Sequence, residues 1–242
     1  MPNRAYRWFR RAGAPSVTRM RAVIALALLP VLVLPAACAP PEPPPFVPAD
    51  LSSGTGASVS TASPGPSTGE AAAPRTETVR VAPGVRVVVE WPVAPDPDRS
   101  AMIEVFRDYV AGAFRAVTSE GRDTGYLGLV EHDAADDASA WAQAFLDRRR
   151  SVRGVARLYM PNVSAVSGSG DDRGAQLDVC VDETRMRLLD ASTGEPVPRQ
   201  PDWTRKPFLQ SAAMGRTEDG SWRIRLFRHA ELPDERAKGC LR

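Results

Sequence analysis

The chain has 242 residues and a formal charge of +2, a length that allows one or two domains. Six of its 31 basic residues precede an apolar run near the N-terminus, so loss of that segment leaves 25 bases against 29 acids, a charge near −4. A nucleic-acid-binding domain needs a surplus of positive charge, so this composition excludes nucleic acid as a partner.

The arginine-rich start and the apolar run over residues 22–37 have the form of a cleaved signal peptide. The run is shorter than the roughly 20 apolar residues of a membrane span, and Pro30 and Pro35 interrupt it. Residues 1–37 are therefore predicted to be an export signal.

The junction at residues 34–38, LPAAC, resembles a bacterial lipobox, whose cysteine takes a diacylglyceryl group and becomes the new N-terminus. It departs from the usual pattern at Pro35, where a branched aliphatic residue is typical. The resemblance implies lipidation of Cys38 and an anchor on the extracytoplasmic face of the cell membrane. The alternative is ordinary secretion with cleavage after Ala39, which discards Cys38.

Residues 38–76 consist mostly of Pro, Ala, Ser, Gly and Thr, so they cannot bury enough apolar surface to offset the entropy lost on ordering. The sequence predicts a disordered tether there, with a reach of about 110 Å when fully extended. One domain is expected to follow, over residues 77–242.

The first half of this domain is predicted to be mainly helical, because its apolar residues recur at helical spacing. The expected elements, in order, are a strand region over residues 79–91 broken at Pro83-Gly84, a helix capped by Asp96 or Asp98 and closed near Gly121, and helical stretches around 126–130 and over about 136–150.

After Ser151 the apolar period changes to two, which predicts antiparallel strands. The expected strands cover residues 153–167, 175–189 and 208–214, and a last strand follows the Asp219-Gly220 turn with Trp222, Ile224 and Leu226 on its apolar face. This order of elements predicts an α+β fold in which N-terminal helices pack on a curved antiparallel sheet.

The strand around residues 175–182 is expected to place aliphatic side chains on one face and Cys180 on the other, together with Asp178 and Asp182. Cys240 is the only sensible partner for Cys180. In an oxidising compartment their bridge would close a loop of about 60 residues and stabilise the fold by about 4 kcal/mol. Two free thiols are the alternative.

The motifs CVD at residues 180–182, DASTG at 190–194 and GSWR at 220–223, with the terminal Cys240, resemble the nuclear transport factor 2-like cone fold (SnoaL/cystatin-like). More closely, the chain is similar to exported actinobacterial lipoproteins of unknown function. The resemblance covers about residues 85–240. It implies a cavity between sheet and helices that takes a small ligand or an envelope protein, and it allows a homodimer through the sheet.

Tyr109, Tyr126 and Trp141 are the candidate walls of that cavity. Cyclase- or isomerase-like relatives use a buried carboxylate there, for which Asp178 and Asp182 are the candidates. Alternatively these two carboxylates lie on an outward face and are neutralised by arginines such as Arg185 or Arg187.

The sequence contains no nucleophile elbow, dinucleotide loop or phosphate loop, and it predicts no cofactor. His132 lies among acidic residues typical of a solvated helix start, with no second ligand at usable spacing, so no metal site is predicted. His229 is expected on the surface. The leading hypothesis is a non-enzymatic, membrane-anchored domain that binds a ligand or protein, and the alternative is an enzyme with a buried carboxylate. A third hypothesis, a pure interaction domain, requires a filled cavity and an apolar patch on the sheet.

Overall fold

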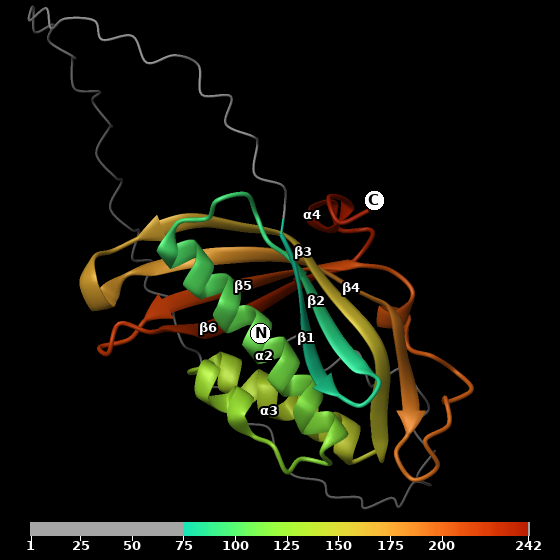
Figure 1. The fold of residues 1–242 in the computed structure, drawn as a ribbon. Coiled ribbons are helices and arrows are strands. Elements are labelled where there is room, and N and C mark those ends of the chain that lie inside the picture. Colours follow the sequence, from blue (N-terminus) through green and yellow to red (C-terminus); the bar gives the residue numbers. More distant parts are fainter. Residues whose placement is uncertain (1–74, 242) are drawn as a thin grey trace, which may run out of the picture. The chain divides into compact units, whose positions relative to one another are not determined.

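The computed structural model describes residues 75–241, which form one six-stranded sheet with two long helices across one of its faces (Figure 1). The strands lie in chain order and are β1 (Thr76–Ala82), β2 (Val85–Glu90), β3 (Arg150–Ser167), β4 (Gly174–Asp190), β5 (Phe208–Arg216) and β6 (Trp222–Ala230). The helical elements are α2 (Pro97–Thr118), a 3-10 helix (Gly125–Leu129), α3 (Asp133–Leu146), the 3-10 turns Gly170–Asp172 and Asp202–Thr204, and α4 (Glu235–Lys238).

The α+β class is confirmed, but the sheet is mixed rather than purely antiparallel as predicted. β2 pairs with β3 in parallel, whereas the other neighbouring strands pair antiparallel. The reason is the connection: α2 and α3 lie between β2 and β3 in the chain and carry it back to the same end of the sheet. The sheet is not closed, because β1 and β6 are its two edges.

The long helix α2 begins and ends as the sequence predicts. Asp96 is its N-cap, and the Asp96 side chain accepts a hydrogen bond of 2.8 Å from the Arg99 amide. At the other end the amide of Gly121 donates to the carbonyl of Ala116 at 2.8 Å, and Gly121 has a φ of +81°, which glycine adopts without strain.

The two later helical predictions need correction. The stretch around residues 126–130 forms only a short 3-10 helix, and Val130 leaves it to form an isolated bridge with Ile224 of β6. The next helix, α3, begins at Asp133 and ends at Leu146, earlier at both ends than the expected range. Its last predicted residue, Arg150, already belongs to β3.

The strands match the predicted periods, with one change of face in β6. Ala213 pairs with Leu226 and Met214 pairs with Ile224, so Arg225 is an extra residue that bulges out of the ladder. The bulge shifts the alternation by one position. Phe227, rather than the expected Leu226, is therefore buried in the core.

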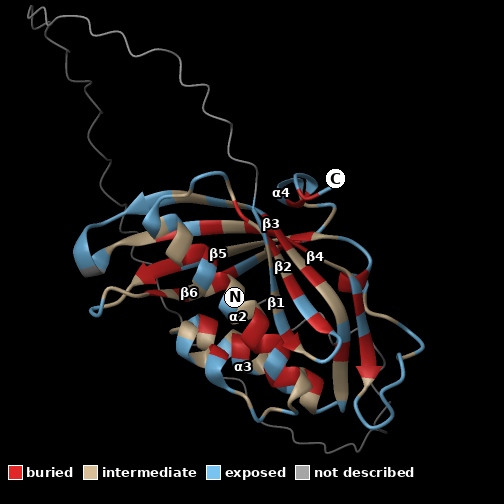
Figure 2. Cartoon of the chain, in the orientation of Figure 1, coloured by how far each residue is buried: buried red, intermediate tan, exposed pale blue. Residues whose placement is uncertain are grey.

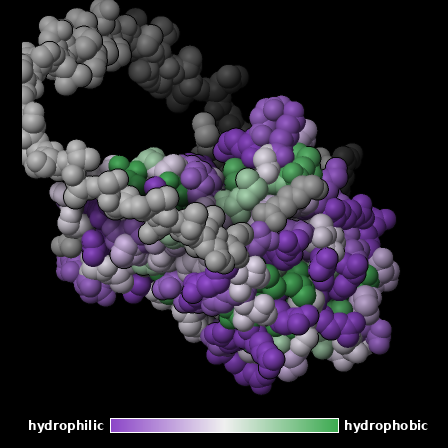
Figure 3. Space-filling view, turned by 45° about the horizontal axis from the view of Figure 1, so that its top comes forward, coloured by the Kyte–Doolittle hydropathy of each residue, from purple (hydrophilic) through white to green (hydrophobic). Residues whose placement is uncertain are grey.

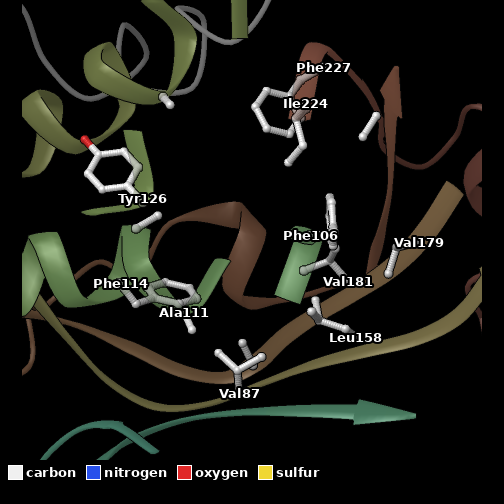
Figure 4. Close-up of a cluster of buried hydrophobic side chains, with 14 of the residues drawn as sticks. Val87, Phe106, Ala111, Phe114, Tyr126, Leu158, Val179, Val181, Ile224 and Phe227 are labelled. Carbon is white, nitrogen blue, oxygen red and sulfur yellow. The ribbon is translucent and has the colours of Figure 1, made fainter. Parts of the chain in front are cut away.

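The hydrophobic core fills the layer between the inner face of the sheet and the helices, where the buried residues concentrate in Figure 2. Val87, Leu158 and Val181 reach it from the sheet, and Phe106 and Phe114 reach it from α2 (Figure 4). The described residues 75–241 thus share one continuous core and one sheet, which is the anatomy of a domain that folds on its own. Since β1 begins at Thr76, the domain starts slightly before the predicted residue 77.

Candidate functional site

The three predicted cavity residues pack into the core layer in two separate aromatic groups. The ring of Tyr109 lies 6.3 Å from that of Tyr126 and 4.9 Å from that of Phe227. Burial raises the pKa of both tyrosines.

Trp141 belongs to the other group, 5.8 Å from the Phe114 ring and 4.7 Å from the Phe145 ring. Tyr126 lies close against α2, since a Cβ added at Gly112 of this helix would stand 2.8 Å from the Cβ of Tyr126. The three residues are thus brought to the same layer, where Tyr109 and Tyr126 contact each other and Trp141 contacts other core side chains.

Asp178 and Asp182 lie on the outer face of β4, where the sequence places them beside Cys180. The Asp178 carboxylate accepts hydrogen bonds from the Ser211 hydroxyl and, at 2.9 and 3.0 Å, from the Gln176 amide. The Asp182 carboxylate accepts from the amide and hydroxyl of Thr184 at 2.9 and 2.7 Å. Neither faces the layer between sheet and helices, so neither is placed to act as a base there.

The expected neutralisation of these carboxylates by arginines is not what the structure shows. Arg187 donates instead to the backbone carbonyls of Thr184 and Met186, at 3.0 and 2.7 Å. Arg185 is exposed and forms no ion pair with any residue of the described domain. Amide and hydroxyl donors therefore satisfy the two carboxylates, and the arginines stay unpaired.

A different carboxyl group, that of Glu183, occupies the inner side of β4. The pairing of β3 with β4 slips at Ala156, which faces both Glu183 and Thr184. Val181 before this bulge and Met186 after it are both in the core. Glu183 follows Val181 by two positions, so it shares the core face of the strand.

Burial, together with the negative charge of the neighbouring Asp182, raises the pKa of Glu183 to about 8. Its carboxyl group is therefore mostly protonated at neutral pH. Sequence reasoning missed Glu183, although the alternation that assigned Leu177 and Val179 to the apolar face assigns Glu183 to that face too.

The disulfide between Cys180 and Cys240 is present, with Cα atoms 5.4 Å apart, within the usual range for such bridges. The bridge joins the tail to the outer face of the sheet, where it packs against Tyr159 and Leu209. The Tyr159 hydroxyl donates a hydrogen bond to the carbonyl of Cys240. The alternative of two free thiols is thereby set aside.

The two histidines lie far from each other in the fold. His132 is exposed at the start of α3, with its Nε2 3.9 Å from a Glu131 carboxylate oxygen. His229 is half-buried, contrary to the surface position expected, because its ring packs 4.5 Å from that of Phe208. Its Nε2 lies 3.0 Å from the carboxylate of Glu231. Within residues 75–241 no group of three His, Cys, Asp or Glu is arranged to hold a metal ion.

Cys38, the signal segment 1–37 and most of the predicted tether lie outside the described residues. Of the helices in the described part, none is long and apolar enough to cross a membrane.

Five exposed arginines form an unpaired basic surface on the outer face of the sheet, which we call the arginine face: Arg80, Arg86, Arg153, Arg185 and Arg187. Register places them together, because Arg80 is directly opposite Arg86 and Arg153 is directly opposite Arg187. Among residues 75–241, none of the five forms an ion pair with a carboxylate.

Like charges directly across a ladder destabilise a sheet by roughly 0.2–1 kcal/mol per pair. The neighbouring row of the same face avoids this cost, since Arg157 donates to Glu90 at 2.6 Å. The arginine face therefore carries an electrostatic cost that an anion would relieve.

A surface hollow lies within the arginine face, at the turn between β1 and β2. Arg80 and Arg86 line it, together with Gly154 and Val155 of β3. The stem of Arg153 lies over Gly84 at the turn, 3.1 Å from where a Cβ would stand. A second hollow, between the β5–β6 turn and Glu131, is lined by charges of both signs. Neither hollow includes a predicted cavity residue or Glu183.

Large exposed apolar side chains are few in the described domain and lie at separate places, namely Val93, Met160, Val166 and Leu241. On the face shown in Figure 3, hydrophobic residues form small patches separated by hydrophilic ones. Scattered apolar residues of this kind are ordinary for a folded domain. The charged surface is therefore the more distinctive feature.

Comparisons with known proteins assign no family to this chain. The sequence matches no model of a protein family, and no curated protein is significantly similar to it. Among solved structures, the chain is similar to the intermembrane space region of the chloroplast protein ARC6, with 13% identity and a TM-score of 0.37. That match covers 56% of this chain and 98% of the other. The α+β class rests on the strands and helices described above.

Proposed function

We propose that the chain is an extracytoplasmic protein, lipid-anchored at Cys38, whose folded domain works by binding an anionic partner rather than by catalysis. The observation that supports this is the arginine face, where five exposed guanidinium groups have no carboxylate partner among the described residues. Arginine suits the role, because its planar fork binds phosphate and carboxylate groups with two hydrogen bonds.

The charge of this surface also bears on the choice of partner. The resemblance to the cone fold allows a homodimer through the sheet, but two arginine faces brought together would repel each other. A negatively charged ligand or envelope component fits the surface better than a second copy. The filled core layer, with its aromatic side chains in mutual contact, favours this outer surface over an inner cavity.

Binding through this surface is tested with the segment from Arg75 to Arg242 on heparin, used as a generic polyanion. We expect the wild-type segment to elute at a clearly higher salt concentration than a variant with all five arginines changed to Gln. A matched variant changes five exposed arginines outside the outer face of the sheet and should elute like the wild type: Arg99, Arg115, Arg122, Arg148 and Arg205. Equal elution of the two variants would refute the proposal.

The anchor is tested separately, by mass spectrometry of the mature protein from bacterial membranes. We expect an N-terminal peptide that begins at Cys38 and carries diacylglycerol, and we expect a Cys38→Ser change to abolish processing and lipid attachment. An unmodified N-terminus at Pro40 would show ordinary secretion instead.

A second candidate function, acid–base catalysis, is favoured by Glu183 alone. A carboxyl group with a pKa of about 8 can exchange a proton near neutral pH, provided that a substrate reaches it. Carbodiimide coupling of a small amine followed by peptide mapping tests this access. Labelling of Glu183 would show that small molecules reach its carboxyl group and would support the enzyme hypothesis. If Glu183 stays unlabelled while the exposed Glu104 reacts, the group is structural.

A further inference from the structure

We infer that the arginine face binds the phosphate groups of anionic phospholipids in the membrane to which the chain is anchored. This inference rests on the proposed function, and it names the partner of the same surface. Two observations carry it, namely the extent of the face and its lack of internal neutralisation, and the predicted tether from Cys38 adds a supporting condition.

The face is broad and built on rigid elements. Its residues come from β1, β2, β3 and β4, which at the usual strand spacing span about 14 Å, in rows about 7 Å apart. That extent matches several lipid headgroups rather than one small anion. Because the residues stand on paired strands, the charges keep their spacing when the domain meets a flat surface.

The surroundings of the face would let it approach a membrane. Arg157 next to it is already neutralised by Glu90, and the carboxylate of Asp182 is held by Thr184. The hollow that Arg80 and Arg86 line is also lined by Gly154 and Val155, so a phosphate there would meet guanidinium groups beside less polar atoms. Each basic residue near an anionic membrane raises the affinity by only about fivefold, so a cluster is needed for binding to be measurable.

The tether supplies the remaining condition. With a predicted reach of about 110 Å from Cys38, it holds the domain at a high effective concentration near the lipid surface. Weak electrostatic contacts then suffice to turn the arginine face toward the membrane. The arginine face would lie on the lipid, and the helical layer would point away from it.

The test is cosedimentation of the segment from Arg75 to Arg242 with vesicles of phosphatidylcholine alone or mixed with phosphatidylglycerol. We expect binding to the anionic vesicles only, weakening as salt rises. The five-arginine variant should bind at least about tenfold more weakly, as the loss of five such contacts requires. The matched variant with the five other arginines should stay within about twofold of the wild type.

Any of three results would overturn the inference. The first is equal vesicle binding by the two variants, and the second is equal binding of the wild type to neutral and anionic vesicles. The third is displacement by inorganic phosphate, but not by chloride of equal ionic strength, which would mark a site for free phosphate. Arginine-dependent retention on heparin without vesicle binding would leave the proposed function in place and refute only the lipid partner. Equal retention of the wild type and the five-arginine variant on heparin would refute both.

Discussion

Removal of the Cys180–Cys240 bridge is expected to lower the free energy of unfolding of the domain by about 4 kcal/mol. The bridge spans 60 residues, so it restricts the unfolded chain over a large part of the domain. The bridge also holds Cys240 in place, so its removal weakens the hydrogen bond from the Tyr159 hydroxyl to the Cys240 carbonyl. A loss of this size is a large fraction of the stability of a typical domain.

The measurement is urea denaturation of the wild type and of a Cys180→Ala, Cys240→Ala double variant, each with and without a reductant. The reductant should shift the wild-type midpoint to that of the double variant and leave the variant unchanged. In the double variant, the increase in hydrogen exchange over the wild type should be largest in residues 231–241, which the bridge joins to β4. A difference below about 1 kcal/mol would show that the tail is held by its packing alone.

Glu183→Gln is expected to stabilise the domain at alkaline pH and to change little at acidic pH. The folded state raises the pKa of Glu183 from 4.5 to about 8, so the folded state binds the proton more tightly than the unfolded chain does. The contribution of this group to stability is thus fully present below about pH 4.5 and is lost as the pH rises through 8. Glutamine cannot ionise, and it avoids the loss.

We expect the variant to exceed the wild type by about 2 kcal/mol at pH 8.5, less than the full pKa shift implies because the side chain keeps some exposure to water. Denaturation of both proteins at pH 5, 7 and 8.5 checks this, since other titrating groups cancel in the difference. Glu104→Gln, on the exposed side of α2, should show no such trend. A difference that does not grow with pH would place the Glu183 carboxyl group in contact with solvent.

The sequence predicted best those features that depend on neighbouring residues. The alternation in β4 placed Cys180 opposite the apolar face, and the Asp96 cap and Gly121 bounded α2, because each depends on local geometry. The bridge to Cys240 followed from the number of cysteines.

Features that depend on distant pairings were missed. The parallel pairing of β2 with β3 joins segments separated by two helices. The bulge at Arg225 moved Phe227 into the core, although strict alternation favours Leu226. Predicting the arginine face requires the register of β1 with β2 and that of β3 with β4. The register of β3 with β4 shifts at several points, so the pairing of Arg153 with Arg187 cannot be predicted from sequence spacing.

The two edges of the open sheet differ in how well they resist the addition of another strand. The edge strand β6 is partly protected. Val130 forms a bridge with Ile224, and the Glu131 amide donates to the Ile224 carbonyl at 2.8 Å, so this backbone carbonyl is already bonded. The bulge at Arg225 also makes the edge irregular. β1 pairs with one described strand and keeps its other side open over Thr76–Ala82. Edge-to-edge pairing between copies of this domain is therefore expected to begin at β1.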